Sequence, residues 1–302
     1  KTTPKPSQCW SLEIFKRMEK GYLDIDEKIE LPLLLNRVNL LHSRCKALSL
    51  DYGNYYTNNL YVSEKAKDFK EIVLNIQFRL NCAVFHIELL CNYVNEIEYN
   101  LNEITEYDYI YLSSKSLNFY YIFDSIIYHI TSLFDYISTI VNFVLENNQK
   151  FVKWNSLVKT YQHKKNDIYK YAYEINQKFV NYLFEIRSIL IHEKIITSVV
   201  PYEMTFSTSG VKHSFKIPTP KPILKYFKKL HSQSEENELS IKYSSFHIMQ
   251  ETIEYITDIL FLLKNHIEQN KKFDKMDVFI EENGVKKFAS ELDWYSHLRE
   301  KK

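Results

Sequence analysis

Arg187 and His192 stand five positions apart in the stretch FEIRSILIHEK, residues 184–194, at the end of an apolar helical pattern. Histidine is the side chain that titrates closest to neutral pH, so it can accept or donate a proton during a reaction. Arginine keeps its charge, and its planar guanidinium can bind two phosphate oxygens at once. The pair therefore combines proton transfer with phosphate binding, the two properties that phosphodiester chemistry needs.

Two further arginine–histidine pairs occur in the sequence, and their positions favour neither as a site. Arg37 and His42 flank the apolar stripe of a short helix whose pattern continues undisturbed. Arg79 and His86 lie on one side of a long helix, about 10 Å apart along its axis. That separation is too large for one phosphate unless both side chains reach inward, so we expect Arg79 and His86 to be flanking residues.

Apolar residues at alternating steps of three and four dominate the chain and predict helices. The stripes cover 69–101, 119–144, 175–189 and 246–267, a shorter one covers 31–48, and Ser244 or Ser245 is the expected N-cap of the last. Alternating apolar residues around STSG at 207–210 and around Asn283-Gly284 predict two β-hairpins. The fold class is therefore mainly all-α, a long-helix up-and-down bundle with two small β-hairpin ornaments.

The same patterns divide the chain into three parts. Residues 1–60 are expected to form an N-terminal helical extension, and residues 61–270 a helical bundle with a β-hairpin insertion near 201–217. Residues 271–302 follow as a C-terminal hairpin and tail. A coiled-coil oligomer would show similar heptads, but the connecting segments favour one compact unit.

Composition excludes several classes of protein. The net charge of +1 provides no global basic field, so nucleic-acid contacts must depend on local patches. The four glycines are far apart, which excludes a dinucleotide fingerprint, a Walker A loop and a G-x-S-x-G elbow. No Glu-x-x-His or His-x-x-x-His spacing occurs, so we expect neither a metal nor a cofactor. Asp124 and Asp135 interrupt the most apolar region, so we expect no membrane span and a cytoplasmic protein.

The RSILIH stretch matches the R-x4-6-H signature of the HEPN superfamily, and residues 107–269 resemble that family's helical bundle. The family places its motif late in the bundle, where Arg187 and His192 lie. It often has Asn, Asp or His after the arginine, where this chain has Ser188. Family members are commonly metal-independent endoribonucleases.

The resemblance implies that Arg187 and His192 are catalytic in the cleavage of single-stranded RNA. The substrate's own 2′-hydroxyl would attack, leaving a 2′,3′-cyclic phosphate and a 5′-hydroxyl. It also implies a homodimer whose two motifs face each other, and a role as a toxin or phage-defence effector with an antitoxin or defence-system partner.

Helix geometry adds a constraint on the motif itself. Five residues on an ideal helix correspond to a rotation of about 140°, so Arg187 and His192 would not face one ligand from an unbroken helix. We therefore expect the helix to end or bend near Ile191, or two protomers to share a groove.

Several other polar residues are candidates for supporting roles. His129 and Asp135 lie off the main stripe of the second long helix and, with Ser188, could orient the motif or the substrate, although solvated or locally bonded polar residues fit the same pattern. Lys225, Lys228 and Lys229 lie in the basic, aromatic stretch KPILKYFKKLH, which could bind RNA or form an ordinary solvated surface.

The sequence fits two further readings. The chain could be a non-catalytic helical bundle that binds a protein or nucleotide partner, in which case changing Arg187 or His192 would alter stability and not turnover. It could also be a subunit of a larger RNA-processing or defence assembly, with the hairpins as docking surfaces.

Overall fold

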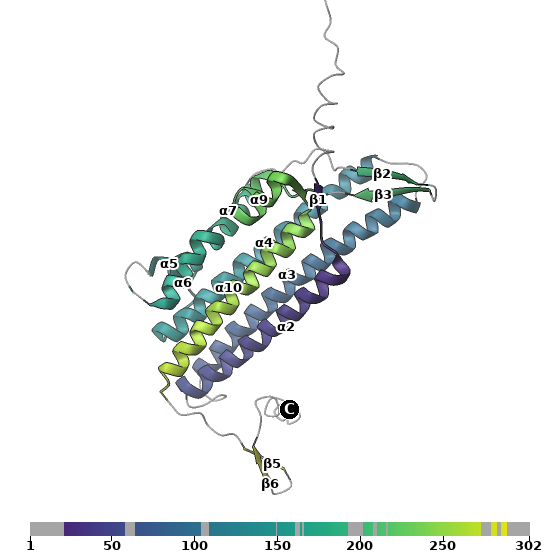
Figure 1. Cartoon of the computed structure of the whole chain (residues 1–302). Coiled ribbons are helices and arrows are strands. Elements are labelled where there is room, and N and C mark those ends of the chain that lie inside the picture. Colours follow the sequence, from purple (N-terminus) through teal and green to yellow (C-terminus); the bar gives the residue numbers. More distant parts are fainter. Residues whose placement is uncertain are drawn as a thin grey trace, which may run out of the picture.

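The computed structural model describes residues 21–57, 64–103, 109–148, 150–160, 164, 166–192, 202–207, 210–215, 217–272, 279–282 and 285–288. Within this part, long helices lie side by side in a bundle (Figure 1). The long rods are α2 (Glu27–Tyr52), α3 (Glu64–Glu103), α4 (Tyr109–Glu146), the composite α6 (Asp167–Ile175), η2 (Asn176–Val180) and α7 (Asn181–His192), and α10 (Ile241–Gln269). The mainly all-α fold class is confirmed.

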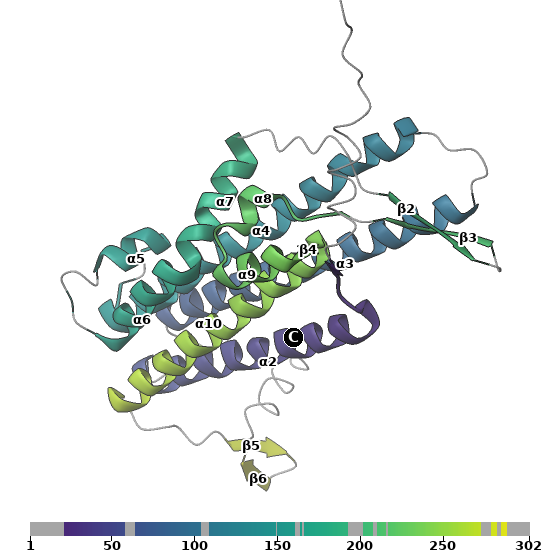
Figure 2. The ribbon, with the colours of Figure 1, turned by 45° about the horizontal axis from the view of Figure 1, so that its top comes forward.

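Consecutive rods run in opposite directions. The pairing of α3 with α4 is antiparallel, because Lys65 near the start of α3 bonds Asn147 beyond the end of α4, whereas Tyr93 bonds Asn118 early in α4. The α6–α7 rod returns against α4 and α10, and Figures 1 and 2 both place it on the side of the bundle away from α2. This alternation is the expected up-and-down topology, with the α6–α7 rod as a fifth member.

The apolar stripes read from the sequence meet in one core. The predicted first long helix corresponds closely to α3, whose buried residues recur at steps of three and four. Aromatic rings pack between the rods at one end. The Phe69 ring stacks on the Tyr52 ring with centroids 4.2 Å apart and contacts the Phe143 ring edge-on with centroids 5.8 Å apart. Because α2 buries its own stripe against α3 and α10, residues 27–52 share the core of the bundle.

The third stripe is one rod that contains a π-helical segment. Residues 176–180 form η2 between α6 and α7, and this wider turn changes the face that the following residues present. The side chain of Asn176 is buried there and accepts a hydrogen bond from the Trp154 indole at 2.9 Å. Trp154 begins the short helix α5 (Trp154–Thr160), so η2 and α5 are held together.

Both predicted hairpins are present. β2 (Tyr202–Ser207) pairs with β3 (Gly210–Phe215), and β5 (Phe279–Glu282) pairs with β6 (Val285–Phe288), both antiparallel. A parallel pair that the sequence did not predict joins β1 (Gly21–Leu23) to β4 (Asn237–Leu239). The remaining short elements are η1 (Gly53–Thr57), α8 (Lys221–Leu224) and α9 (Lys228–Glu236). None of the described helices is both long enough and apolar enough to cross a membrane.

The start of α10 corrects one prediction. Ser240 is the N-cap, because its hydroxyl accepts the Tyr243 N–H at 2.8 Å. The predicted caps Ser244 and Ser245 are buried inside the helix, one turn further on, and the Ser245 hydroxyl donates back to the Ile241 carbonyl. The apolar stripe could not reveal this extra turn because it begins only at Phe246.

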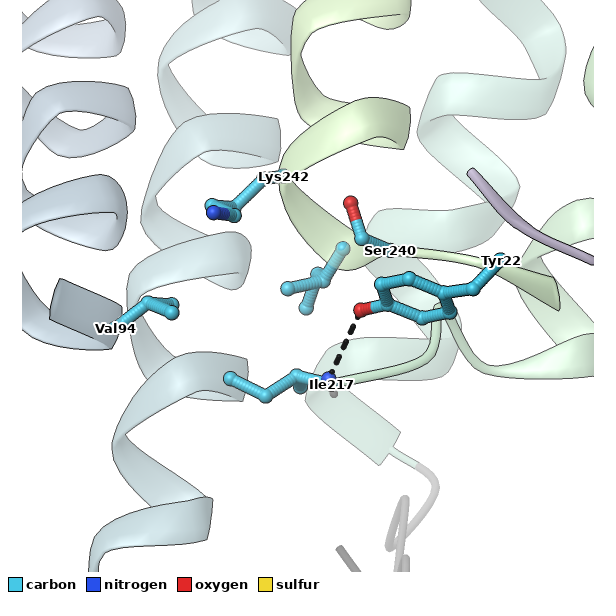
Figure 3. Close-up of a pocket in the computed structure, with 6 residues that line it drawn as sticks. Tyr22, Val94, Ile217, Ser240 and Lys242 are labelled. Atoms are coloured by element: carbon cyan, nitrogen blue, oxygen red, sulfur yellow. Dashed lines mark hydrogen bonds between the residues drawn. The ribbon is translucent and has the colours of Figure 1, made fainter. Parts of the chain in front are cut away.

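A buried ion pair ties this end of α10 to the start of α2. Lys242 is 8% exposed, and its ammonium lies 2.6 Å from Glu27 and 3.2 Å from Asp24. Burial alone would lower the pKa of Lys242, but the two carboxylates outweigh it and raise that pKa. Figure 3 shows Lys242 and Tyr22 among the residues that line one small pocket, and the Tyr22 hydroxyl accepts the Ile217 N–H at 3.1 Å.

Replacing Lys242 by methionine should lower the free energy of unfolding by about 2 to 3 kcal/mol, because Glu27 would stay largely buried without its cation. Asp24 is more exposed, which keeps the loss below the upper range for buried pairs. Urea denaturation followed by circular dichroism measures this difference. Lys264→Met is the matched control on α10, since its pair with Glu268 is half exposed and should contribute less than about 1 kcal/mol. Equal losses in both variants would contradict the prediction.

Candidate functional site

Helix α7 places Arg187 against the outer part of α4. The guanidinium carbon lies 4.9 Å from the centroid of the Tyr128 ring, and Nη1 donates to the Thr131 hydroxyl at 3.5 Å. The Arg187 side chain is half-buried, while Tyr128 is 39% exposed. Arg187 is therefore held by the aromatic face of Tyr128 and by the hydroxyl of the buried Thr131.

A second arginine reaches the same tyrosine from α3. The guanidinium carbon of Arg79 lies 5.4 Å from the Tyr128 ring centroid, and its Nη1 donates to His129 Nδ1 at 3.2 Å. Its Nε is buried and has no hydrogen-bond partner among the described residues. Two cations from α3 and α7 thus converge on one residue of α4.

Two histidines complete this cluster. The rings of His86 on α3 and His129 on α4 have centroids 5.2 Å apart and are tilted by 34°. His86 Nδ1 lies 2.7 Å from the Cys82 carbonyl oxygen one turn earlier on α3. We call Arg79, His86, Tyr128, His129 and Arg187 the seam cluster, because they lie where α3, α4 and α7 meet.

The hydrogen bonds of the seam cluster assign a tautomer to each neutral imidazole. A guanidinium has only donors, so His129 Nδ1 accepts from Arg79 and its ring proton is on Nε2. A carbonyl has only lone pairs, so His86 Nδ1 carries the proton that it donates to Cys82, and the Nε2 of the neutral ring is unprotonated. The Nε2 atom of neutral His129 is therefore a hydrogen-bond donor, and the Nε2 atom of neutral His86 is an acceptor.

Electrostatics keep His129 neutral. Burial, followed by the positive potential of His86 and Arg79, lowers the pKa of His129 from about 6.5 to about 4. At neutral pH the ring is uncharged, which agrees with its acceptance of the Arg79 proton. The carboxyls near Arg187 behave in the opposite way: burial raises the pKa of Asp124 and of Asp135, and the charge of Arg187 opposes that rise in both.

The residues predicted from the sequence are only partly brought together. Arg187 and His129 both belong to the seam cluster. Asp135 lies further along α4, where its carboxylate accepts the backbone N–H of Trp154 at 2.8 Å and so holds the start of α5. Ser188 is exposed.

His192 is the last residue of α7, and its side chain lies outside the described part. α7 is an unbroken α-helix from Arg187 to His192, so their backbone positions are about 140° apart around the helix axis. The only irregularity in this rod, η2, precedes both residues and does not separate them. The helix ends at His192, next to Ile191, where the sequence predicts an end or a bend, and the helix contains no bend between Arg187 and that end.

The three predicted RNA-binding lysines have different surroundings. The Lys225 ammonium lies 4.8 Å from the Tyr226 ring centroid, and Tyr226 packs against Tyr182 of α7 at 5.9 Å. Lys228 is exposed, and Lys229 faces Glu251 of α10 at 3.8 Å. Lys225 and Lys228 keep their charge open to solvent, whereas a carboxylate partly offsets that of Lys229.

The sequence does not predict three members of the cluster: Arg79, His86 and Tyr128. Arg79 and His86 are two turns apart along α3, a distance too large for one phosphate unless both side chains reach inward. Both side chains nevertheless reach His129, which lies between them on the neighbouring helix. The spacing of seven residues between Arg79 and His86 indicates that both lie on one face of α3. It does not indicate which helix packs against that face.

No group of three or more histidine, cysteine, aspartate or glutamate side chains in the described ranges could hold a metal ion. What the seam cluster can do chemically follows from its own groups. Two guanidiniums can bind an anion, one imidazole nitrogen can accept a proton, and another can donate a hydrogen bond.

Replacing Arg79 by methionine should raise the pKa of His129 above about 4, because one of the cations that disfavour its protonation is removed. The folded protein takes up this proton at lower pH than the unfolded chain, so stability is intact above about pH 6.5 and falls towards pH 4. The variant should lose stability less steeply over that window. NMR titration of the imidazoles and urea unfolding at two pH values measure both effects.

The control for this experiment is Arg37→Met, which removes an exposed arginine paired with Glu254 on another face of the bundle. An unchanged His129 titration in Arg79→Met, or an equal change in Arg37→Met, would contradict the electrostatic account.

In comparison with known proteins, no family model, curated protein or solved structure matches this chain.

Proposed function

We propose that the chain is a HEPN-like, metal-independent endoribonuclease that cleaves single-stranded RNA through the substrate's 2′-hydroxyl. The observation that carries this proposal is the convergence of Arg79 and Arg187 on Tyr128, beside a neutral His129. Arg187 belongs to the R-x4-6-H stretch that resembles the family motif, so the sequence pattern and the cluster geometry point to the same surface.

Charge supports a phosphodiester as the ligand. The guanidiniums of Arg79 and Arg187 lie over the same ring, so their positive charges reinforce each other at the surface of α4. An anion placed there gains from both charges, and the gain increases as negative charge develops on the phosphorane. Phosphate is the natural anion for two planar, multidentate donors.

Exposed aromatic side chains support a single-stranded substrate. Phe78 and Phe85 are 57% and 58% exposed, and each adjoins a member of the cluster: Arg79 lies over the Phe78 ring and His86 meets the Phe85 ring edge-on. Unpaired bases can stack on such rings while the backbone follows the cations. A duplex keeps its bases stacked inside and could not use them.

The proposed reaction uses the chain, the substrate and water, which supplies the proton of the departing 5′-oxygen. The 2′-oxygen loses its proton and attacks phosphorus, and the bond from phosphorus to the 5′-oxygen breaks. The products are a 2′,3′-cyclic phosphate and a 5′-hydroxyl. Arg187 binds the phosphate and stabilises the developing charge, while Lys225 and Lys228 contact the RNA backbone further along.

The proposal includes a homodimer in which His192 of each protomer contributes to a shared groove. This part of the proposal agrees with the helix geometry, since the backbone positions of Arg187 and His192 are about 140° apart around one unbroken helix. By resemblance, the proposal extends to a cytoplasmic toxin or phage-defence effector with an antitoxin or defence-system partner.

An alternative function is a non-catalytic bundle that binds a protein partner. The exposed outer face of α3 favours it, because Leu74, Phe78, Phe85 and Leu89 are all at least 38% exposed there. Such a surface suits an apolar partner as well as nucleic-acid bases. The two functions differ in turnover, which the following experiment measures.

Purified protein should cleave end-labelled single-stranded RNA in excess EDTA, and Arg187→Ala should slow cleavage by about 100-fold, because an arginine that stabilises the phosphorane is lost. His192→Ala should also slow it if His192 contributes to the shared groove. Mass spectrometry of the products checks for the cyclic phosphate, and circular dichroism checks folding.

Arg37→Ala is the matched control, since Arg37 also precedes a histidine by five positions but forms a surface pair with Glu254. It should cleave at the wild-type rate. Absence of cleavage by the wild-type protein across salt concentrations would overturn the ribonuclease proposal and favour the binding module.

A further inference from the structure

The proposed ribonuclease needs a proton acceptor at the 2′-hydroxyl and a donor to the phosphate oxygens, and the described surroundings of Tyr128 contain candidates for both. Arg187 lies over Tyr128, and the next residue along α4 is His129. His86 follows at a ring-centroid distance of 5.2 Å. The backbone position of His192, by contrast, is about 140° around the axis of α7 from that of Arg187.

The two imidazoles are prepared for different tasks. His86 Nδ1 is engaged by the Cys82 carbonyl, so its Nε2 holds the lone pair that can accept a proton. His129 Nδ1 is engaged by Arg79, so its Nε2 carries a hydrogen that can be donated in a hydrogen bond. In the described part of the chain, neither Nε2 atom has a hydrogen-bond partner. Both are therefore available to a ligand.

We propose that His86 and His129 are catalytic residues of the proposed ribonuclease, with His86 as general base and His129 as a neutral hydrogen-bond donor to the phosphate. This inference rests on the proposed function and specifies its site. The RNA phosphodiester lies between them and the guanidinium of Arg187. Arg79 is a positioning residue, because it acts on the reaction through His129.

The proposed steps conserve protons and charge. His86 Nε2 takes the proton of the 2′-hydroxyl, the 2′-oxygen bonds to phosphorus, and the bond to the 5′-oxygen breaks. His129 Nε2–H donates a hydrogen bond to a non-bridging oxygen, where negative charge accumulates, and remains a neutral imidazole throughout. The departing 5′-oxygen takes its proton from water, and His86 afterwards returns its own proton to the solvent.

A neutral donor suits this position better than an imidazolium. His129 lies beside His86 and accepts from the guanidinium of Arg79, so a further positive charge on its ring would be repelled by Arg79 and would break that hydrogen bond. A neutral ring keeps the donor in one tautomer, with its hydrogen fixed on the free nitrogen. It also leaves His86, and not His129, as the group that changes charge.

Substitutions that preserve one role and remove another test the assignment. His86→Ala should slow RNA cleavage in EDTA by about 100-fold or more, and added free imidazole should restore part of the rate, because the missing group is a base. His129→Leu should slow cleavage by about 100-fold through loss of the donor. His129→Gln should keep most activity, since its amide N–H can replace Nε2–H.

Three controls accompany these variants. His266→Gln changes a half-buried imidazole on α10 and should cleave at the wild-type rate. Circular dichroism establishes that each variant is folded. Imidazole ¹⁵N NMR of the wild-type protein should show the Nε2–H tautomer at His129 and the Nδ1–H tautomer at His86, and Arg79→Met should lose the defined tautomer at His129.

The outcomes separate this inference from the proposed function. If the wild-type protein cleaves RNA and folded His86→Ala cleaves equally fast, the inference is overturned and the ribonuclease proposal stands. A loss in His86→Ala that imidazole does not restore assigns a structural role and also overturns it, as does the opposite tautomer in NMR. If the wild-type protein does not cleave RNA, both proposals fail.

Discussion

The register between α3 and α4 is the constraint on which the rest of the structure depends. Phe69 of α3 meets Phe143 of α4, and Tyr93 meets Phe119, so the two helices are fixed against each other near both ends. These contacts lie within stripes of buried apolar residues, and sliding one helix by a turn would break them all together. The register therefore decides which polar residues meet in the middle.

Midway along this pair, His129 lies opposite a point between Arg79 and His86. A separation of seven residues is close to two full turns, so both project from the same side of α3 with one turn on each side of His129. The histidine of α4 fills the gap that two residues of one helix leave. The seam cluster is thus a consequence of core packing, and a substitution that loosened the core would also displace its nitrogens.

The sequence predicts the helices well because burial requires periodicity. Periodic apolar residues within one segment predict the bounds of α3 and the two antiparallel hairpins. The same periodicity in successive segments predicts the alternating bundle. Contacts between two distant segments leave no periodic pattern in the sequence. The parallel pairing of β1 with β4 joins residues from opposite ends of the chain, and three-residue strands leave no periodicity to detect.

The candidate site divides in the same way. Arg187 could be singled out because its partner in the motif is near in sequence, and His129 because it lies off the main stripe of its helix. Arg79 and His86 could not be singled out, because the sequence expresses only their separation along one helix. The register of α3 against α4 brings both residues to His129. That register depends on side-chain packing between helices, which cannot be read from a single sequence.

The α6–α7 rod adds the second cation, Arg187, to the cluster between α3 and α4. Without the α6–α7 rod, Arg79 would be the one arginine of the cluster over Tyr128, and its Nη1 already donates a hydrogen bond to His129. α7 runs antiparallel to α4, so its later turns return to the middle of that helix and bring Arg187 to the same ring. Each guanidinium is then held by the aromatic face, although the two repel each other. In the proposed function, a bound phosphate lies near both guanidiniums and relieves that repulsion.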